Sequence, residues 1–249
     1  MNPERRLLAT ATLFATVMVV ASLSVILRGQ AEDRDGNQAQ DSDGSSEQWK
    51  IQQGFRIAPV PLNLKGKDRD LVGLGSFIVN GVADCNGCHT AAPQTEYLAS
   101  GNPYFGEPVK VNPATYLGGG QDFGKVGPPP SPDIVSRNLT PDKTGRPEGG
   151  RSFQEFLQII RTGVDLDNLH PNCSATVTTN CFPTATYNPA NIPGLAPPYT
   201  DGALLQVMPW PVHRNMPYHD LLAIYTYLSA IPCLSTGKPG DELYNDCGP

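Results

Sequence analysis

The chain carries little charge for its length and has no basic stretch of the kind that marks a nucleic-acid-binding surface. Only 17% of its 249 residues are charged, and the formal net charge is −6 at pH 7. Because nucleic-acid binding depends on clustered Lys and Arg, this class of function is excluded. The sequence also lacks a Ser/His/Asp arrangement or a carboxylate pair that would indicate a catalytic site, so we identify no small-molecule substrate.

Convincing strand patterns and internal repeats are also absent, and the regular structure that the sequence does predict is helical. Apolar residues follow helical spacing in three segments. In the middle segment, Ser152 and Glu155 form a capping box, and Gly163 is placed to end the helix. The three predicted helices cover residues 68–80, 153–162 and 220–230.

Glycine and proline, 25 of each, fill long segments between these helices. Residues 91–151 and 164–219 are predicted to be irregular, and loops this long are expected to wrap something. We therefore predict a mainly α fold in which Gly/Pro-rich loops surround a further organising element. Gly73 and Phe77 of the first helix are expected to meet Tyr227 of the last, because a glycine lets two helices approach closely.

Charge is absent from Leu7 to Leu27, and arginines flank this apolar run on both sides. A run of this length spans about 31 Å at helical rise, which matches the hydrocarbon core of a bilayer. Residues 1–31 are therefore predicted to be a transmembrane anchor. A signal peptide cleaved after Gly29-Gln30-Ala31 is the main alternative, and a buried helix is the third. A transmembrane anchor and a cleaved signal peptide would both place the rest of the chain outside the cytoplasm.

Large apolar residues are missing from residues 32–48, which hold six acidic residues and one basic residue. Such a segment cannot bury enough surface to offset its chain entropy, so we predict a flexible acidic linker. Residues 49–249 then form a single domain, with a core over about residues 67–232 and a C-terminal tail over residues 233–249.

The six cysteines suit an exported chain, because disulfides persist in oxidising compartments. Two of them belong to a single C-x-x-C-H sequence. The other four allow three disulfide pairings. We predict the local pairing, Cys173–Cys181 and Cys233–Cys247, with free thiols as the alternative.

Cys85, Cys88 and His89 form the C-x-x-C-H sequence. A thioredoxin-type redox pair would need a surrounding α/β pattern, and zinc would need a second pair of ligands at similar spacing; the sequence has neither. A disulfide across so small a loop would be strained. The interpretation that remains is covalent attachment of one c-type haem through both cysteines, with His89 as the proximal ligand of the iron.

A low-spin electron carrier needs a sixth iron ligand, and His/Met ligation raises the reduction potential of a haem. Met208 lies in a loop ahead of the last helix, and Pro209 would stiffen the loop that holds this weak thioether ligand. We therefore predict Met208 as the sixth ligand. The alternatives are an open iron position or one of four other side chains: Met216, His170, His213 and His219.

The order of these features resembles that of class I cytochromes c, with a helix, C-x-x-C-H, a long loop, a helix, Met-Pro and a terminal helix. More narrowly, four stretches are similar to the cytochrome c domains of bacterial membrane-bound dehydrogenase complexes, such as the alcohol and gluconate types. The resemblance covers about residues 67–232. The four stretches are VNGVADCNGCHT, SRNLTPDKTGRPEG, FLQIIRTGVD and MPWPVHRNMPYHDLLAIYTYLSAIP.

This resemblance implies a class I cytochrome c fold and assigns further residues to the haem site. In the family's pattern the methionine of Met-Pro-Trp is the iron ligand, which is Met208 here. The Asn-Leu-Thr-Pro stretch lies near the haem edge, so Asn138 and Thr140 either contact the propionates or the ligand loop, or cap a turn. Trp210 either lines the haem or is a surface-loop aromatic. The chain departs from the pattern in its single C-x-x-C-H, its long 164–207 segment and its C-terminal tail.

We therefore predict an electron-transfer protein with one haem c and His/Met ligation, and not an enzyme. Its expected partners are redox proteins: a membrane dehydrogenase or respiratory complex, and a terminal oxidase. The expected location is the periplasm, with the N-terminal helix as a tether to the inner membrane or removed as a signal. The alternatives are a haem subunit of an oxidoreductase complex, or a haem enzyme or gas sensor with an open iron position.

Overall fold

The structure, a computed structural model, describes residues 46–125, 133–166, 203–238 and 243–248. The chain divides into two compact units, Met1–Trp49 and Lys50–Pro249, and the second holds nearly all of the described residues. The predicted anchor, most of the predicted linker and the predicted Cys173–Cys181 disulfide lie outside the described residues. Within the four described ranges, no helix combines the length and the apolar character that a membrane span requires.

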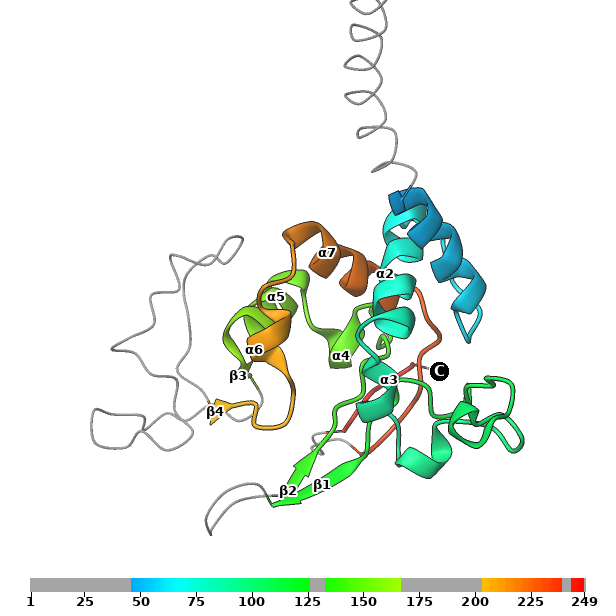
Figure 1. Ribbon diagram of the computed structural model, residues 1–249. Helices are drawn as coiled ribbons and strands as arrows, with labels where there is room; N and C mark the ends of the chain where they lie inside the picture. The colour runs from blue at the N-terminus through cyan, green and yellow to red at the C-terminus, as the bar shows by residue number, and fades with distance from the viewer. Residues whose placement is uncertain (1–45, 126–132, 167–202, 239–242, 249) are drawn as a thin grey trace, which may run out of the picture. The chain divides into compact units, whose positions relative to one another are not determined.

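The second unit is partly helical with little sheet (Figure 1), and helices make up 42% of the described residues. The helices and 3-10 turns are α2 (Arg69–Gly81), α3 (Cys85–Cys88), η1 (Pro93–Thr95), η2 (Pro103–Phe105), α4 (Pro147–Gly150), α5 (Phe153–Thr162), α6 (Trp210–His213) and α7 (Tyr218–Leu228). The strands are β1 (Asp122–Lys125), β2 (Asp133–Val135), β3 (Val164–Asp165) and β4 (Ala203–Leu204). A further helix covers residues 46–57.

All three predicted helices are present, and the middle one, α5, has the predicted bounds. The Ser152 hydroxyl accepts the N–H of Glu155, and the Glu155 carboxylate accepts the N–H of Ser152, so the capping box is formed. Gly163 ends α5 with a φ of 72°, a conformation that favours glycine. The last helix, α7, begins at Tyr218 rather than at the predicted Asp220.

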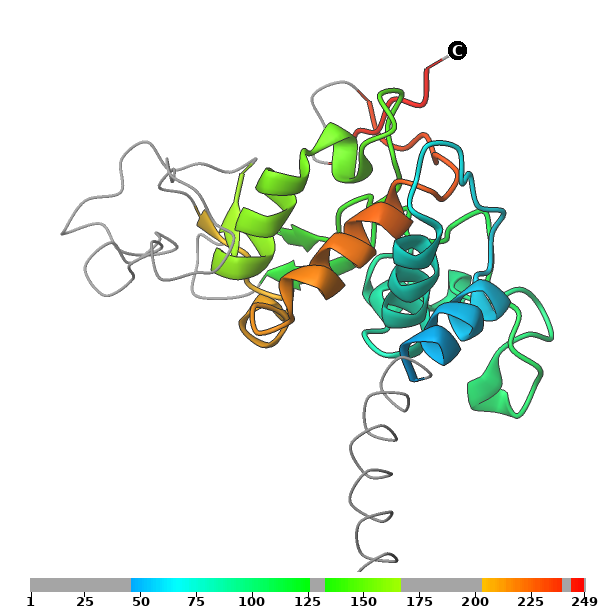
Figure 2. The same ribbon diagram turned by 90° about the horizontal axis from the view of Figure 1, so that it is seen from above.

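Helices α2 and α7 lie side by side (Figures 1 and 2) and pack through Gly75, which corrects the predicted contact through Gly73. A Cβ on Gly75 would lie 2.0 Å from the carbonyl oxygen of Ala223 and 2.7 Å from the Cβ of Tyr227. Tyr227 therefore meets α2 as predicted, but on a different face. Apolar periodicity did not reveal which face this is, because α2 is buried on nearly all sides.

The face of α2 that carries Gly73 packs against the helix over residues 46–57, which was not predicted from the sequence. A Cβ on Gly54 would lie 1.9 Å from the carbonyl oxygen of Gly73, and the Ser76 hydroxyl donates to the Gly54 carbonyl at 2.7 Å. Ile51 and Phe55, four residues apart on this helix, also lie against Gly73. The helix begins inside the predicted linker, so residues 46–48 are helical.

One apolar core joins α2, α5 and α7 to the segment that precedes β1, and Figure 2 shows α5 and α7 running beside each other. The ring of Phe153 on α5 meets the ring of Tyr225 on α7 edge to face, with centroids 5.3 Å apart. The core side chains include Val72, Leu74, Val79, Tyr116, Leu117, Phe156, Leu157, Ile160, Leu221, Ile224 and Leu228.

Two short antiparallel strand pairs correct the expectation of a chain without strands. Asp122 of β1 pairs with Val135 of β2, and Val164 of β3 pairs with Leu204 of β4. These strands are two to four residues long, too short for an alternating pattern to stand out in the sequence. The pairs join segments that were predicted to be irregular.

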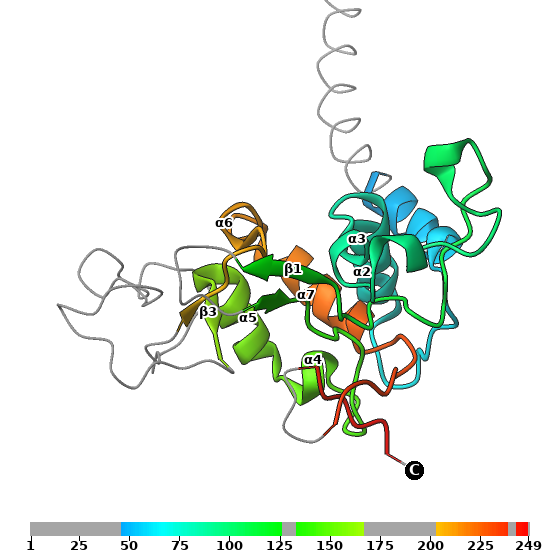
Figure 3. The same cartoon turned by 90° about the horizontal axis from the view of Figure 1, so that it is seen from below.

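The C-terminal tail is closed by a disulfide between Cys233 and Cys247, which confirms this half of the predicted local pairing. The tail also pairs with itself, because Thr236 and Asn245 form an antiparallel bridge. Figure 3 shows the tail lying beside α4 and the segment that leads to it. This contact places the tail against the Asn-Leu-Thr-Pro stretch.

Candidate functional site

Cys85 and Cys88 begin and end α3, a single helical turn that follows α2 (Figure 1). Asp84 precedes the turn in a left-handed conformation with a φ of 47°, and the N–H of His89 donates to the carbonyl of Cys85 at 2.9 Å. Both thiols are free; Cys85 is half-buried and Cys88 is exposed. The turn therefore presents two unpaired thiols next to an imidazole.

His89 is held through both its backbone and its ring. Its ring Nδ1 lies 2.8 Å from the carbonyl oxygen of Arg137, and its own carbonyl accepts the N–H of Gly119 at 2.9 Å. A carbonyl can only accept, so Nδ1 carries the proton and Nε2 keeps its lone pair. A Cβ on Gly119 would lie 2.4 Å from the Arg137 carbonyl oxygen. We call His89, Gly119 and Arg137 the histidine clamp.

The environment of the turn favours neutral side chains. Burial lowers the pKa of His89, and the hydrogen bond to the Arg137 carbonyl only partly opposes this shift. Burial raises the pKa of Cys85 to about 12, with Asp84 and Cys88 adding to the shift, and burial and Asp84 also raise the pKa of Cys88. Redox-active and zinc-binding cysteine pairs need thiolates, which this environment disfavours.

Arg137 also ties the clamp to the end of α5. Its guanidinium forms an ion pair with the Asp165 carboxylate of β3 at 2.7 Å, and both side chains are 13% exposed. β3 directly follows Gly163, the residue that ends α5. The ion pair with Asp165 therefore links Arg137, whose carbonyl accepts from His89, to the end of α5. The hydrogen bond from His89 to Arg137 could not be predicted from residue types, because its acceptor is a backbone carbonyl.

Two buried networks that were not predicted from the sequence fix the turn to the core. Asn86, between the cysteines, accepts the N–H of Leu117 at 2.9 Å. The Tyr116 hydroxyl lies 2.7 Å from the Tyr227 hydroxyl and donates to Asn80 Oδ1 at 2.5 Å. These bonds join α2, α3 and α7 through the segment that also carries Gly119.

Met208 lies in the short segment between β4 and α6 (Figure 1). Its side chain is half-buried against the apolar core, and its carbonyl accepts the N–H of Trp210 at 2.8 Å. Met216 follows α6 and is half-buried against the same core. Burial therefore does not distinguish the two methionines, and Met208 as the sixth ligand stays a prediction.

The histidines considered as alternatives lie in different settings. His213 ends α6, and burial lowers its pKa. His219 is exposed in the first turn of α7. His170 lies outside the described residues.

Trp210 supports the segment that carries Met208. Its indole N–H donates to the carbonyl of Leu205 at 3.1 Å, which closes the segment around Met208. Its ring lies on Gly163, where a Cβ would come within 2.1 Å of the indole. These contacts make Trp210 a support of the Met208 segment, and a haem-lining role for Trp210 stays a prediction.

Asn138 and Thr140 are bonded to each other and to the C-terminal tail. Asn138 Oδ1 accepts the N–H and hydroxyl of Thr140 at 2.8 and 2.6 Å. Asn138 Nδ2 donates to the Leu234 carbonyl and the Thr236 hydroxyl at 2.9 and 2.7 Å. All four hydrogen-bonding positions of the amide are thus occupied. These contacts support the turn-capping reading, and a bond to a haem propionate would have to replace one of them.

Asn245 is a residue of the tail that was not predicted to take part. It is 1% exposed, and its Nδ2 lies 3.0 to 3.2 Å from the Thr140 hydroxyl, the Leu234 carbonyl and the Pro141 carbonyl. The side chain therefore fastens the tail to the Asn-Leu-Thr-Pro stretch, immediately after the Arg137 carbonyl of the histidine clamp. The only signal in the sequence is its closeness to Cys247.

Comparison of the chain with protein-family models, with curated proteins and with solved structures finds no match. Among the described residues, no three His, Cys, Asp or Glu side chains lie close enough together to hold a metal ion. A zinc site at Cys85 and Cys88 therefore finds no second pair of ligands within that part of the chain.

Proposed function

We propose that this protein transfers electrons through one c-type haem attached at Cys85 and Cys88, with His89 as proximal ligand. The observation that carries the proposal is the hydrogen bond between His89 Nδ1 and the Arg137 carbonyl. It satisfies one ring nitrogen and leaves Nε2 as a neutral donor, which is the state in which histidine binds iron. Two free thiols lie on the adjacent helical turn, as thioether attachment requires.

The residues of the site have separate tasks in this proposal. When bound, haem c supplies an iron that changes between ferrous and ferric states. The thiols of Cys85 and Cys88 hold the group at its edge, and the histidine clamp orients the imidazole. The Met208 thioether is the proposed sixth ligand, and Trp210 holds the segment from which it comes. Keeping both ligands in each oxidation state limits reorganisation during transfer.

The proposed setting follows from the rest of the chain. The apolar N-terminal run would anchor the protein in the inner membrane or direct its export, and the Cys233–Cys247 disulfide suits an oxidising compartment. The proposed partners are a membrane dehydrogenase or respiratory complex and a terminal oxidase. A tether would raise the effective concentration of the protein near such partners.

The proposal is tested by the optical spectrum of the haem-loaded chain. Wild type and the Met216→Ala variant are expected to show the weak long-wavelength band of ferric iron bound to sulfur, and Met208→Ala is expected to lose it. Met216→Ala is a matched control, because both methionines are half-buried and precede proline. If Met216→Ala loses the band and Met208→Ala keeps it, Met216 is the ligand.

Two results would contradict the proposal itself. If Cys85→Ala combined with Cys88→Ala still binds haem as wild type does, the cysteines do not attach it. If wild type lacks the iron–sulfur band and its reduced form takes up carbon monoxide readily, the sixth position is open. A haem enzyme, a subunit of an oxidoreductase complex or a gas sensor would then replace the electron carrier.

A further inference from the structure

The segment from Tyr97 to Val111 exposes an unusual amount of apolar surface. Tyr104 and Phe105 are 79% and 81% exposed, Val109 is 65% exposed and Leu98 is 46% exposed. We call these four side chains the apolar ridge. Single exposed apolar residues are common on proteins, but several together in one short segment indicate a surface that another molecule covers.

This exposure is built into the backbone of the segment. Tyr97 and Val111 form an antiparallel bridge, the Leu98 N–H donates to the Lys110 carbonyl at 2.9 Å, and the Lys110 N–H donates to the Gly101 carbonyl at 2.9 Å. The Asn102 side chain accepts the N–H of Tyr104 at 3.0 Å and so caps η2. The tip is therefore held in a folded loop that points its rings away from the core.

The ridge continues to the exposed cysteine of the site. The rings of Tyr97 and Tyr104 meet edge to face, with centroids 6.5 Å apart. Glu96 directly precedes Tyr97, and a Cβ on Gly87, the residue before Cys88, would lie 2.8 Å from Asp84 Oδ2. One carboxylate therefore lies at the start of the ridge segment and a second lies over the cysteine turn.

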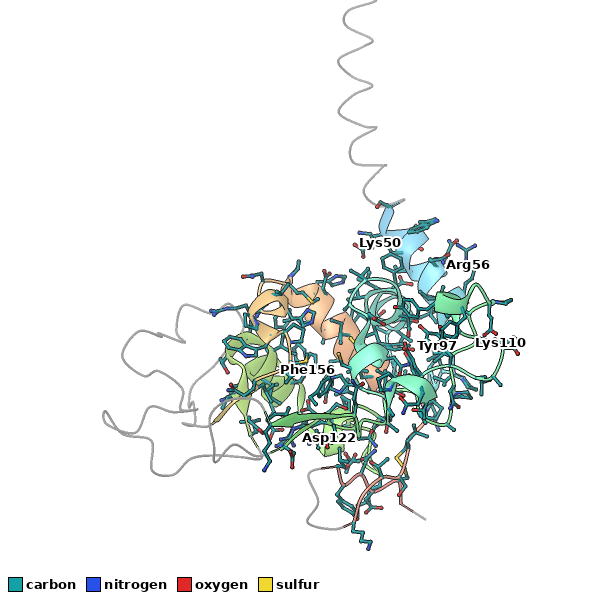
Figure 4. The ribbon with its side chains drawn as sticks, turned by 60° about the horizontal axis from the view of Figure 1, so that its bottom comes forward. Lys50, Arg56, Tyr97, Lys110, Asp122 and Phe156 are labelled. Carbon is teal, nitrogen blue, oxygen red and sulfur yellow. A yellow bond between two sulfur atoms is a disulfide. The ribbon has the colours of Figure 1, made fainter. Side chains whose placement is uncertain are left out.

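The charges on this surface are mixed. Asp84 and Glu96 lie near Cys88, where their charges add to the burial that raises the pKa of its thiol. The segment itself carries Lys110 (Figure 4) and Glu107, whose carboxylate accepts the N–H of Asn102 at 2.9 Å. Charges arranged in this way orient a partner of complementary pattern more than they strengthen its binding. A bilayer with anionic headgroups would be repelled by Asp84 and Glu96.

We infer that the apolar ridge, together with Asp84 and Glu96, is the docking surface for a redox partner protein. The partner presents an apolar centre and places Lys or Arg residues over the acidic pair, next to Cys88. This inference rests on the proposed function, because docking there brings the partner to the edge at which the haem is attached. An apolar centre with a charged rim is the usual make-up of a protein interface.

Stopped-flow oxidation of the reduced, haem-loaded full chain by a lysine-rich soluble cytochrome c tests the inference. Phe105→Ser is expected to slow the second-order rate roughly tenfold at all salt concentrations, because it removes apolar contact. Glu96→Gln is expected to slow the reaction and Lys110→Gln to speed it, each roughly twofold to threefold at low salt and less at high salt.

A matched control separates docking from general damage. Val212 is 69% exposed on α6, and α6 lies well away from the segment over residues 97–111 (Figures 1 and 3), so Val212→Ser should leave the rate within about twofold. Oxidation by ferricyanide, which is too small to need the ridge, should not change in Phe105→Ser.

The result that overturns the inference is a rate for Phe105→Ser equal to that of Val212→Ser. A membrane role for the ridge would be shown instead if Trp fluorescence of Phe105→Trp, in nanodiscs, is quenched by brominated lipid more than that of wild type. Failure of the proposed function is seen separately, as the absence of covalent haem in wild type. Intact spectra with unchanged docking rates refute the docking surface alone.

Discussion

His89 and Met208, the two proposed iron ligands, lie on parts of the molecule that are held in different ways. The carbonyl and ring of His89 are bonded to Gly119 and Arg137, and the stretch after Arg137 is fastened by the C-terminal tail. Met208 lies on a short segment supported by Trp210, whose ring packs on the end of α5. The end of α5 serves both sides, because Arg137 pairs with Asp165 directly after it. The C-terminal tail fastens only the His89 side, so a change in the tail can disturb that side separately.

The largest effect is expected from Gly163→Ala, which acts on the Met208 side. The residue has a φ of 72°, and the new Cβ would lie 2.1 Å from the Trp210 ring. The backbone strain and the displaced ring together should cost about 3 kcal/mol of unfolding free energy, measured by denaturant titration of the haem-loaded chain. Carbon monoxide uptake by the reduced protein should become faster, because the Met208 segment loses its support.

A glycine elsewhere supplies the control for that substitution. Gly145 has a φ of 79°, and a Cβ added there would have no other atom within 4 Å. Gly145→Ala should therefore cost only about 1 kcal/mol and leave carbon monoxide uptake unchanged. If Gly163→Ala and Gly145→Ala lose the same unfolding free energy, the Trp210 contact does not support the Met208 segment.

The next largest effect is expected from Asn245→Ala, which acts on the His89 side. Removing this amide leaves the buried carbonyls of Pro141 and Leu234 with fewer donors and should cost about 2 kcal/mol. The exchange of the His89 Nδ1 proton, followed by NMR, should become faster while carbon monoxide uptake stays the same. Asn215→Ala is the control, since that exposed amide makes only bonds of 3.4 Å. Faster carbon monoxide uptake in Asn245→Ala would contradict the separation of the two sides.

A smaller, pH-dependent effect is expected from Glu155→Gln at the start of α5. Partial burial alone would raise the pKa of Glu155, but bonds from Ser152 and the charge of Arg151 outweigh it, so the pKa is lowered. Its stabilisation is therefore complete above the ordinary pKa of 4.5 and is lost as the pH falls through the lowered folded-state pKa. Near pH 7, the unfolding free energy of wild type should exceed that of the variant by less than about 1 kcal/mol, because the carboxylate is partly exposed.

Denaturant titrations at several pH values measure this difference. It should shrink toward zero as the pH is lowered below 4.5. A difference that stays constant from neutral to acid pH would mean that the carboxylate charge adds nothing to the capping box.

The smallest effect is expected from Asp246→Asn in the tail. Its carboxylate accepts from Lys143 at 2.6 Å, and this ion pair lies at the surface. Solvent and salt screen such pairs, so denaturant titration should detect no change. A clear loss would show that the tail is held by its surface charges and not by the buried Asn245 amide.

The elements that could be predicted from sequence are those whose signals are local. Helix α5 has the predicted bounds because Ser152, Glu155 and Gly163 act within one turn of its ends. The Cys233–Cys247 bond was predictable because its partners are close in the chain. The helix over residues 46–57 was not predicted, because its first turn lies in the polar segment interpreted as a linker and its apolar contact with α2 rests on only a few residues, Ile51 and Phe55 beside Gly73.

The candidate site divides in the same way. The residue types at Cys85, Cys88 and His89 carry the prediction of a covalent haem, because that chemistry requires these groups at this spacing. The roles of the Arg137 carbonyl and of Asn245 could not be predicted. Every residue has a backbone carbonyl, and the sequence does not show whether an asparagine is buried or exposed.

By itself, the sequence determined which reactive groups are present, namely the C-x-x-C-H motif and two methionines before proline. It also determined α5, whose end signals are local. Only the tertiary structure decided that Gly75 and not Gly73 meets α7, that Arg137 orients His89, and that the tail seals the stretch beside it. The reason is physical: local signals act within a few residues of the chain, whereas these contacts join residues that only the folded core brings together.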